Sequence, residues 1–360
     1  MDLSVVVPTL NGRDRLAACL DSVAAGAPDA EVIVVNGPSA DGTTGMVRDR
    51  DDVDVLVEIS DRTVTVARNA GIEVATGDAI ALVDFDNRIT DSWVEGVQRG
   101  LKRADVVTGP VTPVGSNGEP VDNEAGIGDE VDANGDGERT VDGDGERTVD
   151  GDGERKAGSD GESKADGDET RAGNEERGPE RRRIAGQEVT YFASGNVAFR
   201  RETLRDLDGF DEYLHIGGAR DAAHRLARMD QTVSWDAAVA VTKELPTRTA
   251  ADGGRADRDW GWKYRALAYR LLKNYGVRPT VVARTAKHAL TDAWATARDV
   301  VRGEATPSGW AANGRDVVFG IASGSSDGLV ARARDRSPAR NPNGLSKRAD
   351  RAVAKYDRRE

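Results

Sequence analysis

The stretch Asp78-Ala-Ile-Ala-Leu-Val-Asp84-Phe85-Asp86 joins an apolar run to two closely spaced carboxylates. The run predicts a short buried strand, and Asn87-Arg88 then predict a turn. In an extended segment, side chains two residues apart point to the same side, so Asp84 and Asp86 would form an anionic pair. At the carboxyl end of a strand, such a pair can hold a divalent cation against a diphosphate. An isolated Asp-x-Asp can equally be a solvated strand end, so the surrounding sequence has to decide.

The sequence before this stretch alternates between strand-like and helix-like segments. Apolar runs predict strands, and apolar residues spaced three or four apart predict helices. The segments are strands at 3–7, 31–35 and 78–84 and helices at 14–25 and around 67–72. Strand, helix, strand, helix and strand in this order predict a parallel, right-handed α/β unit.

Polar residues follow each of the three predicted strands. Thr9 follows the first, Asn36 to Asp41 follow the second, and Asp84 with Asp86 follow the third. Ligands of open α/β sheets bind at the carboxyl ends of the strands. The sequence therefore predicts a nucleotide pocket at this edge of the sheet.

Several motifs occur in a fixed order along the chain. They are Pro8-Thr9-Leu10-Asn11, the run from Val34 to Thr43, Ala67-Arg68-Asn69-Ala70-Gly71, Val83-Asp84-Phe85-Asp86, Ala193-Ser194-Gly195-Asn196 and Asp208-Gly209-Phe210-Asp211-Glu212. In this order and spacing, the chain resembles the family 2 glycosyltransferases of the GT-A fold, in particular those of salt-adapted archaea. The resemblance covers residues 1–114 and 187–245. It implies a Rossmann-like α/β domain that transfers a hexose from a nucleotide-diphosphate sugar by an inverting displacement, with Mg²⁺ or Mn²⁺ as cofactor.

The resemblance also implies roles for individual residues. Asp86 would bind the metal, and Asp84 would lie nearer the ribose or a metal-bound water. Thr9 and Asp41 would line the nucleoside site, with simple turn capping as the alternative for both. Arg68 would bring positive charge to the base or the phosphates, with a solvated helix arginine as the alternative.

Two positions depart from the family pattern. Asn36-Gly37 stand where the family has an acidic pair, so Asn36 would contact the base through its amide. The family's general base is the Asp of a Glu-Asp pair, and here Asp221 follows Arg220. We expect Asp221 to be the catalytic base, with a helix N-cap as the structural alternative and His224, one turn further on, as the reserve base.

Composition suggests a setting for this domain. The 360 residues carry a net charge of −13 with little Lys, which suits a salt-adapted interior. The single cysteine, Cys19, falls on an apolar helix face, so we expect it to pack, in a reducing compartment. We find no signal peptide and no apolar run of about 20 residues, so we expect a cytoplasmic protein, peripheral at most on the inner face of the membrane.

An insert separates the two halves of the predicted domain. Residues 115–186 contain few apolar residues and repeat the octet Gly-Asp-Gly-Glu-Arg-Thr-Val-Asp at 135–142 and 143–150. Such a segment cannot bury enough surface to offset its ordering entropy, so we predict an acidic, disordered insert. The flanking segments 106–111 and 188–192 read as strands that could pair.

The last hundred residues are basic and lie outside the family's core, which ends near residue 257. We predict a helical extension over 258–335, with helices at 260–275, 279–301 and about 309–334, and a mobile tail over 336–360. Basic helices with aromatic flanks can lie on an anionic membrane, which would suit a lipid-linked glycan or polyprenyl phosphate acceptor. The alternative is that these helices pack on the acidic domain.

Two rival functions follow from the same features. A catalytically inactive relative that binds a nucleotide sugar or scaffolds glycan assembly would fit the departures at Asn36 and Arg220. A nucleic-acid-binding protein would fit the basic, aromatic-containing C-terminal part, but no recognised nucleic-acid motif occurs, so we expect no nucleic-acid partner.

Overall fold

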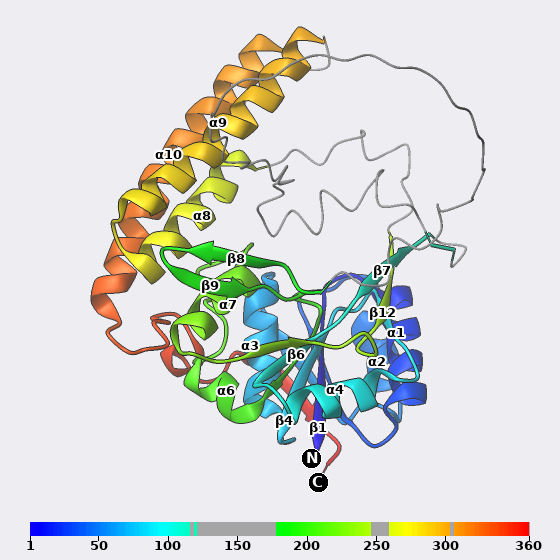
Figure 1. The fold of residues 1–360 in the computed structure, drawn as a ribbon. Helices are drawn as coiled ribbons and strands as arrows, with labels where there is room; N and C mark the ends of the chain where they lie inside the picture. The colour runs from blue at the N-terminus through cyan, green and yellow to red at the C-terminus, as the bar shows by residue number, and fades with distance from the viewer. Residues whose placement is uncertain (116–118, 121–177, 246–258, 303–305, 360) are drawn as a thin grey trace, which may run out of the picture. The chain divides into compact units, whose positions relative to one another are not determined.

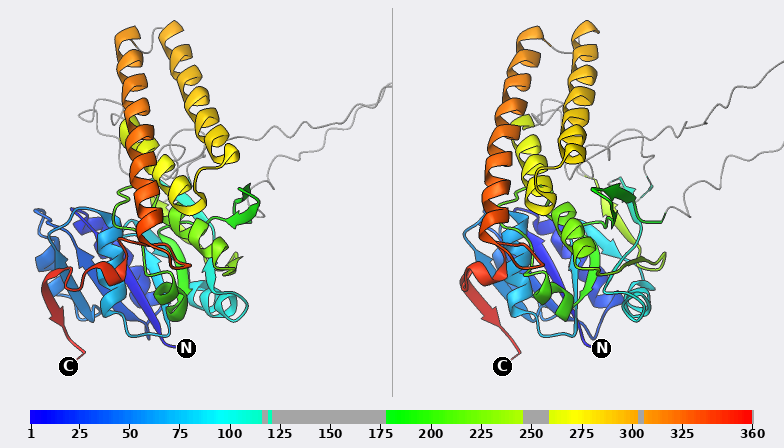
Figure 2. Two further views of the ribbon diagram at one scale, coloured as in Figure 1. Left: turned by 90° about the vertical axis from the view of Figure 1, so that its left-hand side faces the viewer. Right: turned by 60° about the vertical axis from the view of Figure 1, so that its left-hand side comes forward.

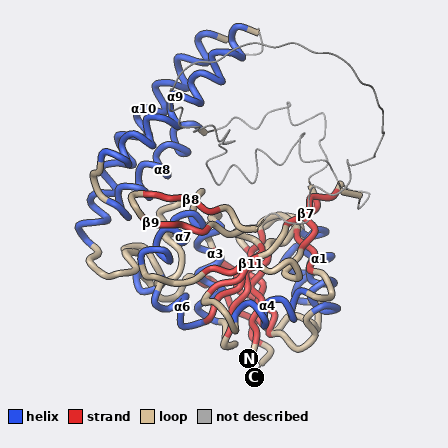
Figure 3. The backbone as a smooth tube through the Cα atoms, viewed as in Figure 1, coloured by secondary structure: helices blue, strands red, loops and turns tan. Residues whose placement is uncertain are grey.

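The computed structural model describes residues 1–115, 119–120, 178–245, 259–302 and 306–359. An eight-stranded sheet runs through these residues (Figures 1 and 3). In spatial order its strands are β11 (Val233–Trp235), β6 (Val106–Thr108), β10 (Asn196–Arg200), β4 (Ala79–Val83), β1 (Leu3–Thr9), β2 (Glu31–Asn36), β3 (Val55–Ile59) and β13 (Ala352–Asp357).

The centre of the sheet is parallel, as the sequence predicts. β4, β1, β2 and β3 run parallel to one another, whereas β10 and β13 run antiparallel to their neighbours. Alternate residues of β1 enter different cores, with Val5 and Val7 on one face and Val6 on the other. Both faces are therefore buried, which explains why the strands read as continuous apolar runs. The predicted α/β fold with a parallel centre is confirmed.

Helices cover both faces of the sheet. On one face lie α1 (Arg13–Gly26), α2 (Thr43–Arg48) and α4 (Trp93–Leu101), and on the other α3 (Val64–Val74), α6 (Arg201–Asp206) and α7 (Gly218–Arg228). Cys19 packs in the first core, and burial raises the pKa of its thiol to about 12. A thiol in that state is a packing residue rather than a nucleophile, as expected.

Two small sheets lie beside the main one. The first joins β5 (Asn87–Ile89), β12 (Val241–Glu244) and β7 (Val111–Val114). The second is a hairpin of β8 (Arg181–Ile184) and β9 (Gln187–Thr190). Two predictions need correction here: segment 106–111 does not pair with 188–192, and the end of the predicted insert is a strand. The backbone hydrogen-bonding groups of β9 pair with β8 in the hairpin, and those of β6 pair with β10 and β11. Neither strand therefore needs the other as a partner. The remainder of the insert, 121–177, lies outside the described residues.

The three predicted C-terminal helices are present as α8 (Trp260–Tyr275), α9 (Pro279–Val301) and α10 (Pro307–Arg334). Figure 2 shows α9 and α10 side by side, with α8 along the lower part of α10. A stripe of glycines lets α10 approach α8: a Cβ on Gly320, Gly324 or Gly328 would lie 2.1–2.6 Å from a backbone oxygen of α8. Within the described residues, no helix has both the length and the hydropathy needed to cross a membrane.

The tail is not mobile as predicted, because it packs on the domain. Residues 352–357 form β13, which extends the main sheet beyond β3. Before that strand, the buried Arg351 binds Glu73 and Glu212, and Arg348 lies 3.0 Å from Asp61. Basic residues of the tail therefore meet acidic residues of the domain. This packing of the tail reflects opposite charges on the two segments.

Candidate active site

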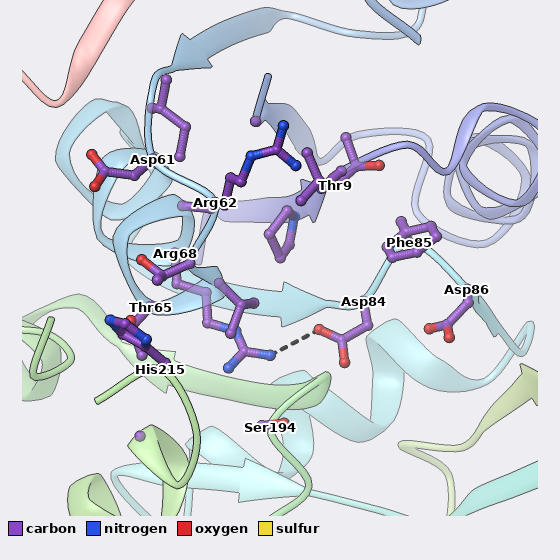
Figure 4. Close-up of a pocket in the computed structure, with 18 of the residues that line it drawn as sticks. Thr9, Asp61, Arg62, Thr65, Arg68, Asp84, Phe85, Asp86, Ser194 and His215 are labelled. Carbon is purple, nitrogen blue, oxygen red and sulfur yellow. Dashed lines mark hydrogen bonds and ion pairs between the residues drawn. The ribbon is translucent and has the colours of Figure 1, made fainter. Parts of the chain in front are cut away.

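A pocket opens at the carboxyl ends of the central parallel strands, where the sequence predicts a ligand site (Figure 4). The end of β1, the loop between β3 and α3, the turn after β4 and the loop before α7 line it. Its polar lining residues are Thr9, Asp61, Arg62, Thr63, Thr65, Arg68, Asp84, Asp86, Ser194, His215 and Lys243.

Asp84 and Asp86 both line the pocket, but not for the predicted reason. Phe85 and Asp86 form a turn, closed by a 2.9 Å hydrogen bond from the Asn87 N–H to the Asp84 carbonyl. The turn, not an extended backbone, therefore brings the two carboxylates to one side. Gly195 makes room for Asp84, since a Cβ there would lie 2.1 Å from the carboxylate carbon.

Arg68 faces Asp84 across the pocket. The guanidinium, on a side chain that is only 4% exposed, donates to the Asp84 carboxylate at 2.8 Å. Arg68 comes from α3, whose first turn follows the pocket-lining loop after β3. A solvated helix arginine is therefore excluded, since the side chain is buried and paired.

Asp86 is buried beside two cations, each farther from its carboxylate than Arg68 is from the carboxylate of Asp84. Its carboxylate lies 3.6 Å from Nζ of Lys243 and 3.8 Å from a guanidinium nitrogen of Arg15. Burial raises the pKa of Asp86, the nearby Lys243 ammonium lowers it, and the Asp84 carboxylate raises it again; the net direction is upward. A carboxyl group in this setting gains from a further cation, because more positive charge would favour its ionised form.

Three polar atoms in the pocket wall are buried without a hydrogen-bond partner among the described residues. They are the hydroxyl oxygens of Thr9 and Thr63 and Nε of Arg68. Buried polar groups are almost always paired, so such atoms beside a cavity are suited to a polar ligand. Thr9 thus lies where the sequence predicts it, with its hydroxyl available.

Asn36 and Asp41 are placed differently from Thr9, since neither lines the pocket as described. The Asn36 amide donates to Thr44 and accepts from Ser39, and so holds the turn after β2. Asp41 accepts hydrogen bonds from the backbone N–H groups of Arg13 and Thr43. Asp41 therefore makes the turn-capping contacts that the sequence allows as its alternative role.

Asp221 lies in α7, three residues after the first, Gly218. The helix N-cap is Gly217, so the N-cap alternative for Asp221 is wrong. The fully buried carboxylate contacts Arg225 at 2.8 Å and Lys273 at 2.7 Å, and Asn274 donates to it at 2.9 Å. Although burial acts to raise the pKa of Asp221, Lys273 and Arg225 hold it below its ordinary value.

This environment disfavours Asp221 as a base, because its oxygens are occupied by Arg225, Lys273 and Asn274. Its role as a base stays a prediction. The reserve candidate His224 is also buried, between the hydroxyls of Tyr275 at 2.8 Å and Tyr191 at 3.5 Å. Neither residue lines the pocket.

Several lining residues were not among the predicted site residues. Ser194 belongs to a motif that was recognised, and His215 is one of only three histidines. Nothing in the local sequence marks Asp61, Arg62 or Lys243 as site residues. Asp61 and Arg62 reach the pocket from the loop after β3, and Lys243 reaches it from β12, which pairs with β5. The described residues contain no group of three or more His, Cys, Asp or Glu side chains placed to hold a metal.

Comparison with known proteins finds similar sequences for the first part of the chain. Residues 4–130 match the model for glycosyl transferase family 2. Glycosyltransferase AglE of Haloferax volcanii is 32% identical over 100 residues, which cover 26% of this chain and 33% of that protein. The uncharacterized glycosyltransferase YibD of Escherichia coli is 32% identical over 97 residues, covering 26% and 28%. The match therefore spans a third or less of these relatives.

Solved structures with similar folds cover most of the chain. The mannosyltransferase PcManGT from Pyrobaculum calidifontis, in complex with GDP-Man and Mn²⁺, has a TM-score of 0.50 at 17% identity, covering 93% of this chain and 87% of that one. TarS 1–349 of S. aureus, in complex with UDP-GlcNAc, has a TM-score of 0.54 at 15% identity, covering 94% and 90%. At these identities the likeness shows a shared fold.

Proposed function

Because residues 4–130 match the model for glycosyl transferase family 2, we propose that this protein transfers a hexose from a nucleotide-diphosphate sugar to an acceptor. The observation that carries the proposal is the pocket in which Asp84 and Asp86 face Arg68 and Lys243. A diphosphate and its metal need both carboxylates and cations within reach. The two similar structures with bound nucleotide sugars support this choice of ligand.

The donor's two ends would lie on different parts of the pocket. The nucleoside would lie along Thr9, Gly37 and Asp61, where the unpaired Thr9 hydroxyl can contact it. The diphosphate would lie between Arg68 and Lys243, whose positive charges offset its own. Asn36 and Asp41 would act indirectly, by holding the turn that carries Gly37.

The residues present fit a divalent cation. Mg²⁺ and Mn²⁺ are commonly held by one or two carboxylates together with phosphate oxygens and water, so three protein carboxylates are not required. Asp86 would bind the metal, with Asp84 beside it. When bound, the metal offsets the negative charge that grows on the leaving diphosphate. Arg68 fixes the orientation of Asp84, and Gly195 leaves the space that Asp84 occupies. We infer a single displacement with inversion at the anomeric carbon.

The acceptor would be a lipid-linked glycan or a polyprenyl phosphate, which the protein would meet at a membrane surface. Large apolar side chains on α9 and α10 are strongly exposed, including Trp294 at 70%, Val301 at 88% and Phe319 at 66%. Aromatic residues on interfacial helices favour the headgroup region. Sedimentation of the full chain with anionic and neutral vesicles tests this, and failure to bind either would contradict it.

Donor binding provides the main test. We expect UDP-, GDP- or dTDP-sugars to bind more tightly with Mn²⁺ or Mg²⁺, measured by calorimetry at high salt together with release of the nucleotide. Asp86→Asn should abolish the gain in donor affinity that the metal provides. Asp29→Asn, a change at an exposed carboxylate outside the pocket, is the matched control. If no nucleotide sugar binds, the proposed function is wrong. Binding without release of nucleotide would favour the inactive-relative alternative, which the enclosed Asp221 keeps open.

A further inference from the structure

The pocket wall next to α7 contains one imidazole and no carboxylate among its described lining residues. His215, Gly217 and Gly218 form this wall, whereas the lining carboxylates come from other loops: Asp61 follows β3, and Asp84 and Asp86 follow β4 (Figure 4). Each of these carboxylates contacts a cation: Arg348 at 3.0 Å from Asp61, Arg68 at 2.8 Å from Asp84, and Lys243 at 3.6 Å from Asp86. His215 instead contacts an aromatic ring.

That ring comes from the helical extension. Trp262 of α8 stacks on His215 with the ring centroids 4.4 Å apart and an interplanar angle of 27°. Trp262 is itself held by Arg265, whose guanidinium lies 5.2 Å from its ring, and by Tyr213, 5.9 Å away. Tyr213 also stacks on Tyr269 of α8 at 4.1 Å. Aromatic residues of α8 therefore fix the loop that presents the imidazole to the pocket.

Space remains beside the imidazole for an acceptor. Gly217 has φ of +76°, a backbone conformation that glycine adopts without strain. Gly218 lies so close to Thr65 that a Cβ on it would come within 2.7 Å of the Thr65 methyl. A Cβ on Gly217 would likewise lie 2.8 Å from a guanidinium nitrogen of Arg270, so both glycines let neighbouring side chains pack closely. His215, Gly217 and Gly218 all line the pocket, so the pocket extends to the imidazole.

We propose that His215 is the catalytic base for a hydroxyl acceptor and that Trp262 positions it; this rests on the proposed transferase function. The imidazole accepts the proton of the acceptor hydroxyl while that oxygen forms a bond to the anomeric carbon. The bond from the anomeric carbon to the β-phosphate oxygen breaks, and the nucleoside diphosphate leaves with the electron pair. The imidazolium then returns its proton to water.

This assignment narrows the class of acceptor. A phosphate acceptor is already anionic near neutral pH and has no proton that must be removed before attack. A sugar hydroxyl is neutral and needs a base. The presence of an imidazole at this wall therefore favours the hydroxyl of a glycan over a polyprenyl phosphate.

Charged groups on several elements face this part of the pocket and enter the pH dependence. The loop after β3 and helix α3 bring Asp61, Arg62 and Arg68, and the opposite side brings Asp84, Asp86 and Lys243. Helix α8 contributes Arg265 behind Trp262 and the buried Arg270, one of whose guanidinium nitrogens would lie 2.8 Å from a Cβ on Gly217. Because His215 is not among the residues that would contact the donor's diphosphate or metal, a change at His215 should leave donor binding intact.

The experiment compares His215→Asn with wild type in the full-length protein. Donor binding is measured by calorimetry, and transfer is measured to water, to octyl glycosides and to a short-chain polyprenyl phosphate across pH 5–9. We expect kcat for the best hydroxyl acceptor to fall by about 10²–10⁴-fold, with donor affinity unchanged. The rise of the wild-type rate with pH, as the base loses its proton, should disappear. His288→Asn, a histidine of α9 outside the pocket lining, is the matched control.

Trp262 tests the positioning role. Trp262→Phe keeps an aromatic face for the imidazole and should retain most of the rate, whereas Trp262→Ala should lower kcat and change KM for the donor little. Equal rates in wild type and Trp262→Ala would overturn the role of Trp262.

Three results would overturn the role of His215. The first is a His215→Asn rate near wild type at every pH. The second is transfer to the polyprenyl phosphate alone, and the third is donor binding without any transfer by wild type. If wild type binds no nucleotide sugar, the proposed function itself fails and this inference fails with it.

Discussion

Lys273 of α8 offers a direct measure of how firmly the helical extension is joined to the domain. Its fully buried ammonium lies 2.6 Å from Asp211 and 2.7 Å from Asp221. Lys273→Met keeps most of the apolar stem but leaves two buried carboxylates without their shared cation. Removing one partner of a buried ion pair costs about 3–5 kcal/mol. Since single domains are stable by about 5–15 kcal/mol, this change would remove a large part of the total.

A matched control lies on the same helix. Lys263 forms an ion pair of the same length, 2.7 Å, with Asp292, but both side chains are about a quarter exposed. Exposed pairs contribute less than about 1 kcal/mol, so Lys263→Met should have a small effect. The assay is urea unfolding followed by circular dichroism at fixed salt. A loss for Lys273→Met no larger than that for Lys263→Met would refute the reasoning.

The stability lost in Lys273→Met should depend on pH in a definite direction. In wild type, Lys273 and Arg225 outweigh burial and lower the pKa of Asp221. A carboxyl group with a lowered pKa in the folded state adds stability above its unfolded pKa, and that stability is lost as pH falls through the folded value. Without Lys273 only Arg225 remains as a cationic partner, so the pKa of Asp221 rises relative to wild type and protonation becomes easier. The deficit of Lys273→Met should therefore be largest near neutral pH and shrink toward about pH 4.

Three further predictions follow from packing and charge. In Gly324→Val the new Cβ would lie 2.1 Å from the Arg265 carbonyl oxygen, so the melting temperature should fall by several degrees. The control Gly314→Ala has open space around the new Cβ and should raise the melting temperature slightly. Asp86→Asn should leave the melting temperature of the ligand-free protein equal or higher, because burial raises the pKa of Asp86 and the charged form is unfavourable there; a lower value would show a structural role. Removing residues 352–359 should expose the edge of β3 and promote association in light scattering, and an unchanged monomer would contradict this.

The sequence predicts the parallel centre of the fold well because local signals agree there. The apolar runs at β1, β2 and β4 and the intervening helices form as expected. β3 was overlooked, and the pairing of β13 with β3 could not be foreseen, since a charged strand far along the chain gives no sign of its partner. The tail, rich in Arg with Ser-Pro and Asn-Pro, therefore reads as mobile until the acidic residues that it contacts are known.

The residues of the candidate site also include some that the sequence predicts and some that it does not. Thr9, Arg68, Asp84 and Asp86 come together because they end or follow central strands and the first helices. Asp221 was chosen by its spacing from a motif, and spacing does not reveal that α8 brings Lys273 and Asn274 to its carboxylate. Contacts between distant segments decide whether such a group is buried.

The position of β13 has a consequence for the order in which this chain can fold. Arg48 and Tyr356, which contact each other beside this edge of the sheet, are 308 positions apart in the sequence. Synthesis proceeds at about 5–20 residues per second. The edge of β3 therefore stays unpaired until residues 352–357 leave the ribosome. Helix α8, which neutralises Asp211 and Asp221, also arrives late. The domain is thus completed only when these late segments emerge, and until then the nascent chain is the form most exposed to strand-to-strand association and to chaperones.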